Sequence, residues 1–302
     1  MHKLIISLFL SLTFNVLLSQ NRIDSLKTVQ DIQNFVDDKS ISEFVKVVET
    51  VPYEKKYQKL ADSIGVNAWT KADFDNDGRT DILINGLLGN ELKTICILDK
   101  GTHYETQKIN KGKLFEEVSF TIVKENKIHY YNYKILNRFG FISNLLHTKL
   151  VYKFGGFLEE NLKPKQHNIL EFDYFDGGSY GLLNDLKMKI ISNKDIEGNF
   201  RTQKSYNSEI RKNNYNGQVS AEDFKTLIDL INYIDFENLD ENYNVSYTDA
   251  ATAYLEIVYG QLLRKKIRDY GMSGTRGLEI LYKLLRKINS DQISQTPTTN
   301  HE

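Results

Sequence analysis

The stretch Asp73-Phe74-Asp75-Asn76-Asp77-Gly78-Arg79-Thr80-Asp81 runs directly into an apolar segment, Ile82-Leu83-Ile84. Acidic residues occupy positions 1, 3, 5 and 9 of this loop, and glycine occupies position 6. Carboxylate oxygens on alternate residues, with a glycine where the backbone turns sharply, are the ligand pattern of a calcium-binding loop. The apolar segment is typical of a buried strand, so the loop is expected to end where a strand begins.

The predicted calcium site consists of Asp73, Asp75, Asp77, Arg79 and Asp81. Arg79 would contribute its backbone carbonyl oxygen, and Asp81 would close the site directly or through a water molecule. An EF-hand carries a bidentate glutamate at position 12, but Ile84 stands there. The loop is therefore not an EF-hand, and without that ligand we expect a dissociation constant on the order of 10⁻⁴ to 10⁻³ M.

Crowding of four carboxylates in this loop links its order to cation binding. Like charges repel one another, which raises the pKa of some of the acids, and a divalent cation removes the conflict. Binding of Ca²⁺ and ordering of the loop should therefore be coupled. The alternative is a solvated turn, because Asp, Asn and Gly favour turns without any ion.

Together with Trp69 and Ala72, this stretch resembles the calcium loop of FG-GAP and VCBS-type repeats. Those repeats place D-x-D-x-D-G-x-x-D and a hydrophobic residue in a turn between strands. The resemblance covers only residues 69–84 and occurs once in the chain. It implies a calcium ligand set at the acidic positions, and it does not extend to the propeller that tandem copies build.

The N-terminus has the pattern of a signal peptide. Met1-His2-Lys3 is basic, Leu4–Leu18 is mainly apolar, and the chain turns polar after Ser19. We therefore predict a signal peptide over residues 1–19 and an exported protein, periplasmic or extracellular. The alternative is an N-terminal membrane anchor, but the apolar run is short and interrupted. No stable membrane insertion is expected after cleavage.

Composition excludes some classes of function. Lys and Arg number 39 and Asp and Glu number 40, so there is no net positive charge to attract nucleic acid. Cys96 is the single cysteine and lies in an apolar run, which excludes an internal disulfide. A bound cation would supply some of the stability that exported proteins often gain from disulfides.

Apolar spacing predicts helices over residues 22–64, including a segment capped by Ser42 that carries Phe44, Val45 and Val48. Short strands separated by Gly and Asn turns follow. They are expected at 82–84, 92–98, 103–109, 115–123, 128–135, 145–154, 167–175, 186–192, 198–204 and 206–213. Asn216-Gly217 predicts a tight turn, Ser220 a helix cap, and Gly260-Gln261 a hairpin turn.

These patterns predict an α+β protein of two domains, each a mainly antiparallel sheet with packed helices. The predicted organisation is a signal peptide over 1–19, a helical segment with a calcium-loop β-domain over 20–162, an α+β domain over 163–289 and a disordered tail over 290–302.

The second half resembles a domain of unknown function found in bacterial exported proteins. The residues that carry the resemblance are Ser220-x-x-Asp223-Phe224, Phe236, Leu239, Tyr243, Thr248-Asp249 and Lys266-Ile267-x-Asp269-Tyr270-Gly271. It covers about residues 167–289. Members often carry cysteine and proline near the first hairpin, whereas residues 176–181 here have neither. The resemblance implies a fold and no activity.

Two glycine-rich motifs resemble parts of active sites. Gly177-Gly178-Ser179-Tyr180-Gly181 matches the hydrolase pattern G-x-S-x-G, but the only later histidine is His301 in the tail. Residues 271–277 lie between a predicted strand and helix, where backbone N–H groups bind anions, but they lack the spacing of a nucleotide-binding loop. A Gly-rich turn and a helix-capping turn are the simpler interpretations.

Aromatic residues are dense between 130 and 141, which is compatible with a sugar-binding platform or with sheet packing. The sequence therefore predicts an exported, calcium-stabilised, non-catalytic binding or scaffolding protein. Its partner is an unknown protein or glycan. A hydrolase of envelope polymers and a carbohydrate-binding or adhesion module are the alternatives.

Overall fold

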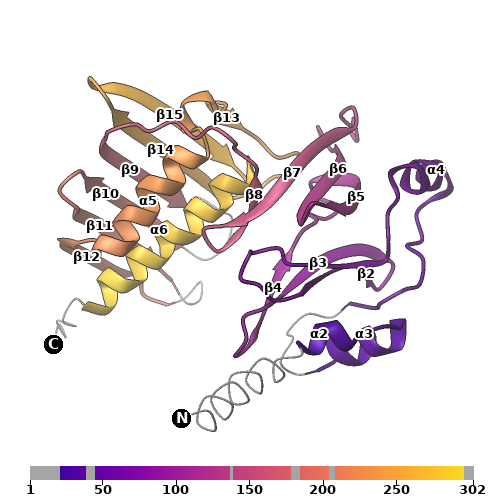
Figure 1. Ribbon diagram of the computed structural model, residues 1–302. Helices are drawn as coiled ribbons and strands as arrows, with labels where there is room; N and C mark the ends of the chain where they lie inside the picture. Colours follow the sequence, from indigo (N-terminus) through magenta and orange to yellow (C-terminus); the bar gives the residue numbers. More distant parts are fainter. Residues whose placement is uncertain (1–20, 39–44, 137–138, 178–183, 204–207, 296–302) are drawn as a thin grey trace, which may run out of the picture. The chain divides into compact units, whose positions relative to one another are not determined.

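The computed structural model describes residues 21–38, 45–136, 139–177, 184–203 and 208–295 (Figure 1). Antiparallel sheets dominate and a few helices accompany them, which confirms the α+β class. The chain divides into two compact units. The first comprises the residues up to Gly112 together with Val118–Asn132, and the second comprises Lys113–Glu117 and the residues from Tyr133 onward. The signal peptide predicted at 1–19 and Ser179 lie outside the described residues.

The first unit contains a four-stranded antiparallel sheet in the order β1-β2-β3-β4. Its strands are β1 (Trp69–Ala72), β2 (Asp81–Leu88), β3 (Glu91–Asp99) and β4 (Tyr104–Lys108). This confirms the predicted strands at 82–84, 92–98 and 103–109. They form a meander because short apolar segments are separated by turns that contain Gly and Asn. The predicted calcium loop connects β1 to β2.

Two short helices cover one face of this sheet: α2 (Arg22–Ser25) and α3 (Val29–Val36). Helix α3 starts at a capping box, in which Thr28 accepts from the Asp31 N–H and Asp31 accepts from the Thr28 N–H. Apolar side chains of both helices pack on alternate residues of β2 and β3. These contacts form one core of Ile23, Leu26, Ile32, Phe35, Val36, Val45, Val47, Ile82, Ile84, Ile95 and Ile97.

Residues 45–48 do not form the predicted helix. Lys46 instead pairs with Leu87 of β2 through two backbone hydrogen bonds of 2.7 and 3.0 Å. Gly86 permits this approach, since a Cβ there would lie 2.6 Å from the Lys46 carbonyl oxygen. The proposed cap, Ser42, lies outside the described residues. The later helix, α4 (Lys55–Ile64), agrees with the prediction and ends at Gly65 in the left-handed conformation.

A second sheet has the strand order β5-β6-β7-β8. Its strands are β5 (Glu116–Lys124), β6 (Lys127–Lys134), β7 (Leu146–Lys153) and β8 (Gly156–Glu159). The β5–β6 turn is formed by Glu125 and Asn126, both with positive φ. They turn the chain between the strands expected at 115–123 and 128–135.

The second unit contains a seven-stranded sheet in the order β12-β11-β10-β9-β14-β15-β13. All neighbours are antiparallel except β13 and β15. The strands are β9 (Ile169–Gly177), β10 (Asn184–Ile191), β11 (Asp195–Thr202), β12 (Arg211–Gln218), β13 (Asn242–Tyr243), β14 (Thr252–Tyr259) and β15 (Leu263–Tyr270).

Helices α5 (Ala221–Tyr233) and α6 (Arg276–Gln295) cover one face of this sheet, as Figure 1 shows. Ser220 caps α5 as predicted, since its side chain accepts a hydrogen bond from the Asp223 N–H. The short 3₁₀ helix η1 (Phe236–Asn238) follows. Apolar residues of both helices and of the inner sheet face form a second core.

Two predictions for this unit are wrong. Asn216-Gly217 is not a turn, because β12 pairs with β11 along its whole length and Gly217 lies opposite Ile196. The polar tail does not begin at residue 290, because α6 continues to Gln295. Buried Gln292 donates a hydrogen bond to the Gln218 carbonyl oxygen, which holds this last part of the helix against β12.

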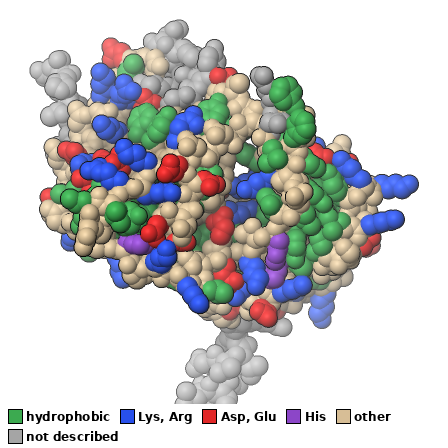
Figure 2. All heavy atoms as spheres, turned by 90° about the horizontal axis from the view of Figure 1, so that it is seen from above, with side chains coloured by type: hydrophobic (Ala, Val, Ile, Leu, Met, Phe, Trp, Pro, Cys, Tyr) green, Lys and Arg blue, Asp and Glu red, His purple; other side chains and the backbone are tan. Residues whose placement is uncertain are grey.

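The surface carries both signs of charge. Figure 2 shows Lys and Arg side chains interspersed with Asp and Glu on the face that it displays. Among the described residues, none of the helices has the length and apolar content needed to cross a membrane.

Candidate metal centre

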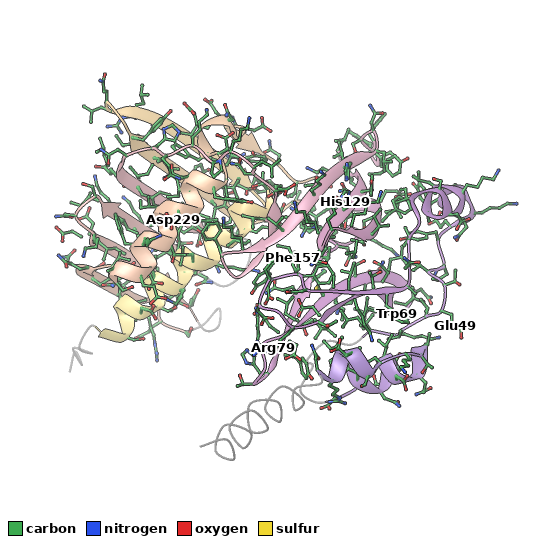
Figure 3. All side chains as sticks on the ribbon, viewed as in Figure 1. Glu49, Trp69, Arg79, His129, Phe157 and Asp229 are labelled. Atoms are coloured by element: carbon green, nitrogen blue, oxygen red, sulfur yellow. The ribbon has the colours of Figure 1, made fainter. Side chains whose placement is uncertain are left out.

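The acidic loop is held at both ends by the β1–β2 pair, in which Ala72 lies opposite Asp81. Figure 3 labels Arg79 in this loop and Trp69 at the start of β1. Two loop residues adopt the left-handed conformation: Asn76 with φ of 60° and Gly78 with φ of 85°. No atom would obstruct a Cβ at Gly78, so the backbone conformation alone favours glycine there.

Three of the predicted ligands converge. Asp73, Asp75 and Asp81 each present a carboxylate oxygen, and these atoms all lie within 4.8 Å of one another. Asp81 is completely buried, and the Asp75 side chain is only 4% exposed. In the part of the chain that the structure describes, Asp73, Asp75 and Asp81 are the side chains that come close enough together to bind one metal ion.

Asp81 is fixed by hydrogen bonds from two parts of the chain. Its Oδ2 accepts from the Phe74 N–H at 2.8 Å, and its Oδ1 accepts from the Asp99 N–H at 2.8 Å. The carboxylate therefore ties the start of the loop to the end of β3. These two donors favour the ionised form of the acid.

Burial works against that ionised form. The pKa of Asp81 is raised to about 7, mainly by loss of hydration; the charges of Asp75 and Asp77 contribute to the increase, and the two backbone donors oppose it. The two backbone hydrogen bonds therefore favour the ionised form of Asp81, whereas burial and the neighbouring carboxylates favour the protonated form. An added positive charge within the cluster would resolve this opposition.

The chain itself supplies one positive charge. The Lys100 ammonium donates a hydrogen bond to Asp75 Oδ2 and lies 3.8 Å from Glu105 Oε2. Lys100 follows β3 directly, in the β3–β4 turn. In the sequence, Lys100 stands beside Gly101 between two predicted strands, which marks it only as part of a turn. Its contact with Asp75 forms because the β3–β4 turn lies beside the acidic loop, and no local sequence pattern predicts that contact.

The other two predicted ligands lie differently. Asp77 is not part of the converging group; it accepts from the Arg79 N–H at 2.8 Å, and its Oδ2 lies 2.9 Å from the Arg79 guanidinium. Asp73 accepts from the N–H groups of Asp77 at 3.1 Å and Gly78 at 3.0 Å. The loop is thus shaped by carboxylate-to-backbone hydrogen bonds. Each carboxylate oxygen has a second lone pair, so Asp73, Asp75 and Asp81 keep the capacity to coordinate a cation.

The structure gives no added support to the turn at 271–277 as an anion site or to the aromatic segment at 130–141 as a sugar platform. The turn at 271–277 has its amides engaged, because Asp269 accepts from the N–H groups of Ser273 at 3.2 Å and Gly274 at 3.0 Å. This contact fits the helix-capping interpretation. In the aromatic segment, Tyr130 is buried, whereas Phe139 is 74% and Phe141 65% exposed. These rings therefore do not share one environment.

Comparison with known protein families assigns part of the second unit. Residues 173–289 match the model of a family described as a domain of unknown function (DUF6438). No curated protein and no solved structure matches the chain. The matched region excludes the acidic loop and agrees with the resemblance inferred for residues 167–289. The C-terminal half of this chain therefore contains a DUF6438 domain, which spans residues 173–289.

Proposed function

We propose that this protein is an exported, non-catalytic binding or scaffolding protein stabilised by Ca²⁺ at the β1–β2 loop. The observation that carries the calcium site is the convergence of Asp73, Asp75 and Asp81 within 4.8 Å. Oxygen donors at this density suit hard cations such as Ca²⁺, which takes six to eight oxygen ligands in flexible geometry. The resemblance to FG-GAP and VCBS-type loops supports the same ion.

Calcium is favoured over a transition metal by the donor set. The converging groups are carboxylates, and the apolar residues flanking the loop offer no imidazole or thiolate. Magnesium demands near-ideal octahedral geometry and keeps much of its water, which suits a tightly turned loop less well. Backbone carbonyl oxygen from Arg79 and water would complete the coordination.

The binding role rests on the sequence and on the N-terminal pattern. The signal peptide predicts export, where millimolar Ca²⁺ suits a site of weak affinity. The hydrolase alternative needs a base after Ser179 in the chain, and the sequence offers only His301. We therefore propose that the two units present surfaces to a partner and that calcium keeps the first unit folded.

Isothermal titration of the chain without its signal peptide tests the calcium site. Metal-free protein titrated with CaCl₂ should bind one equivalent with a dissociation constant on the order of 10⁻⁴ to 10⁻³ M. Asp73→Asn should abolish the binding, because it removes one of three converging carboxylates. Asp62→Asn is the matched control, since Asp62 lies on exposed α4 and contacts Gln58 at 2.9 Å. Equal binding by both variants would reject the site.

A further inference from the structure

We propose that the open face of the seven-stranded sheet binds a short neutral oligosaccharide, in a groove across β10, β9, β14 and β15. This inference extends the proposed binding role to the second unit and does not depend on the metal. The groove has a volume of about 430 Å³. That volume falls in the range of about 300–1,000 Å³ usual for small-molecule sites.

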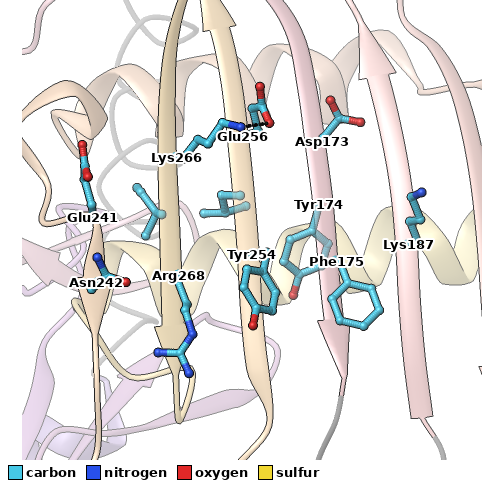
Figure 4. Close-up of a pocket in the computed structure, with 12 residues that line it drawn as sticks. Asp173, Tyr174, Phe175, Lys187, Glu241, Asn242, Tyr254, Glu256, Lys266 and Arg268 are labelled. Carbon is cyan, nitrogen blue, oxygen red and sulfur yellow. Dashed lines mark ion pairs between the residues drawn. The ribbon is translucent and has the colours of Figure 1, made fainter.

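Strand alternation determines which side chains face the groove. On β9, Phe172 and Tyr174 are buried in the core that the helices cover, so Asp173 and Phe175 point to the opposite face. On β14 the same alternation exposes Tyr254 and Glu256 between buried neighbours. Figure 4 shows these side chains on the open face.

Pairing register brings like residues together in two rows. Tyr254 lies opposite Phe175, and their ring centroids are 6.0 Å apart with an interplanar angle of 39°. Glu256 lies opposite Asp173. Figure 4 shows the aromatic row and the carboxylate row running side by side across the strands. Lys187 stands opposite Phe175 at one end of the aromatic row, and Arg268 is paired with Tyr254 at the other.

The aromatic row suits the apolar faces of sugar rings. The face of an aromatic ring carries partial negative charge, and the C–H bonds of a pyranose present partial positive charge to it. Tyr254 is 45% exposed, so its ring is available at the groove surface. Flat rings that are already packed by a neighbour lose little conformational entropy on binding, which favours such contacts.

The charges in the groove favour a neutral ligand. Its lining contains three acidic and three basic side chains: Asp173, Glu241, Glu256, Lys187, Lys266 and Arg268. An anion would meet the carboxylates and a cation would meet the ammonium and guanidinium groups. A neutral polyhydroxyl compound uses both, because each hydroxyl donates to a carboxylate and accepts from a cationic donor.

Hydrogen-bonding capacity remains at both ends of the aromatic row. Among the described residues, the Lys187 ammonium and the Tyr254 hydroxyl make no hydrogen bond within the protein. Glu256, by contrast, is held by Arg264 at 2.5 Å and Lys266 at 3.1 Å, which fixes its position. The groove thus combines Glu256, an acceptor held in place by two ion pairs, with the Lys187 ammonium and the Tyr254 hydroxyl, which can still donate hydrogen bonds to a ligand.

Titration with defined glycans tests the proposal. The chain without its signal peptide would be titrated with cellohexaose, laminarihexaose, xylohexaose and mannohexaose, and with anionic oligogalacturonate and cationic chitosan oligomers. We expect saturable binding of at least one neutral glycan and weaker binding of both charged ones. Tyr254→Ala and Phe175→Ala should each weaken that binding roughly tenfold, and Tyr254→Phe should weaken it less.

Leu263→Ala is the matched control, because Leu263 is 56% exposed on β15 and does not line the groove. Unchanged melting temperatures would verify that each variant is folded. The inference is overturned if no neutral glycan binds, if a charged one binds more tightly, or if both aromatic variants bind normally. Repeating the titration in EGTA separates the two proposals, since glycan binding should persist there whether or not the calcium site is real.

Discussion

Lys100 donates a hydrogen bond to the carboxylate of Asp75, so the acidic loop already contains one positive charge from the chain itself. In the metal-free protein this ammonium relieves part of the repulsion among the carboxylates. A bound Ca²⁺ would sit among the same oxygens and would compete with it. The two cations are therefore expected to oppose each other.

Lys100→Met should change stability in opposite directions with and without calcium. Without calcium, loss of the ammonium leaves a nearly buried Asp75 uncompensated, so the free energy of unfolding should fall by about 1–3 kcal/mol. With calcium, the competitor is gone and the affinity should rise by roughly tenfold. Thermal unfolding in EGTA and titration with CaCl₂ measure the two effects. A loss of calcium affinity would show that Lys100 supports the cation site instead.

The pKa of Asp81 predicts a pH dependence. Burial raises it to about 7 from an ordinary value of 3.8, so the folded chain holds this proton more tightly than the unfolded chain. The resulting stability is complete below the ordinary value and is lost as the pH rises through about 7. Metal-free protein should therefore lose stability over that interval, and calcium should restore it mainly at the upper end.

Melting temperatures measured at about pH 5 and about pH 8, with and without CaCl₂, test this prediction. The stabilisation by calcium should be larger at about pH 8, where Asp81 is ionised in both states of the chain. Equal stabilisation at the two pH values would indicate that Asp81 does not contribute to the site.

Asn85 should be essential to the first unit. Its amide donates to the carbonyl oxygens of Asn67 at 2.8 Å and Thr121 at 3.2 Å, and its Oδ1 accepts from Thr94 at 2.9 Å and Thr121 at 2.8 Å. All of these contacts are buried or partly buried. Asn85→Leu would leave several polar groups unsatisfied and should lower the free energy of unfolding by about 2–4 kcal/mol.

Chemical denaturation of Asn85→Leu measures this cost, with Thr94→Val as the graded control. The control removes one donor and leaves the Thr121 hydroxyl on Asn85, so its cost should be about 1 kcal/mol. A loss of similar size in the two variants would mean that the network is not the source of the effect.

The sequence predicted most of the β-structure, because alternation and turn residues act locally. The loop, the cap at Ser220 and the hairpin around Gly260 all follow from residues within a few positions of one another. The convergence of Asp73 with Asp75 also follows from alternate spacing within one loop. Such features need no knowledge of distant parts of the chain.

The failures all involve distant partners. Residues 45–48 have apolar spacing compatible with a helix, but the open backbone at Gly86 lets Lys46 pair with β2 instead. The pair Asn216-Gly217 favours a turn locally, yet β11 extends the ladder past it. The groove likewise depends on the pairing of Tyr254 with Phe175, which lie nearly eighty positions apart in the chain. The register of β14 against β9 determines this pairing, and the local spacing of residues does not predict that register.

The most direct test of the calcium claim is the melting temperature of the chain without the predicted signal peptide (residues 1–19), in EGTA and in about 10 mM CaCl₂. With a dissociation constant on the order of 10⁻⁴ to 10⁻³ M, that concentration should stabilise the fold by about 1–3 kcal/mol and raise the melting temperature by several degrees. The increase should disappear in Asp75→Ala and persist in Asp62→Asn. An identical melting temperature in EGTA and CaCl₂ would contradict the proposal that this loop binds calcium.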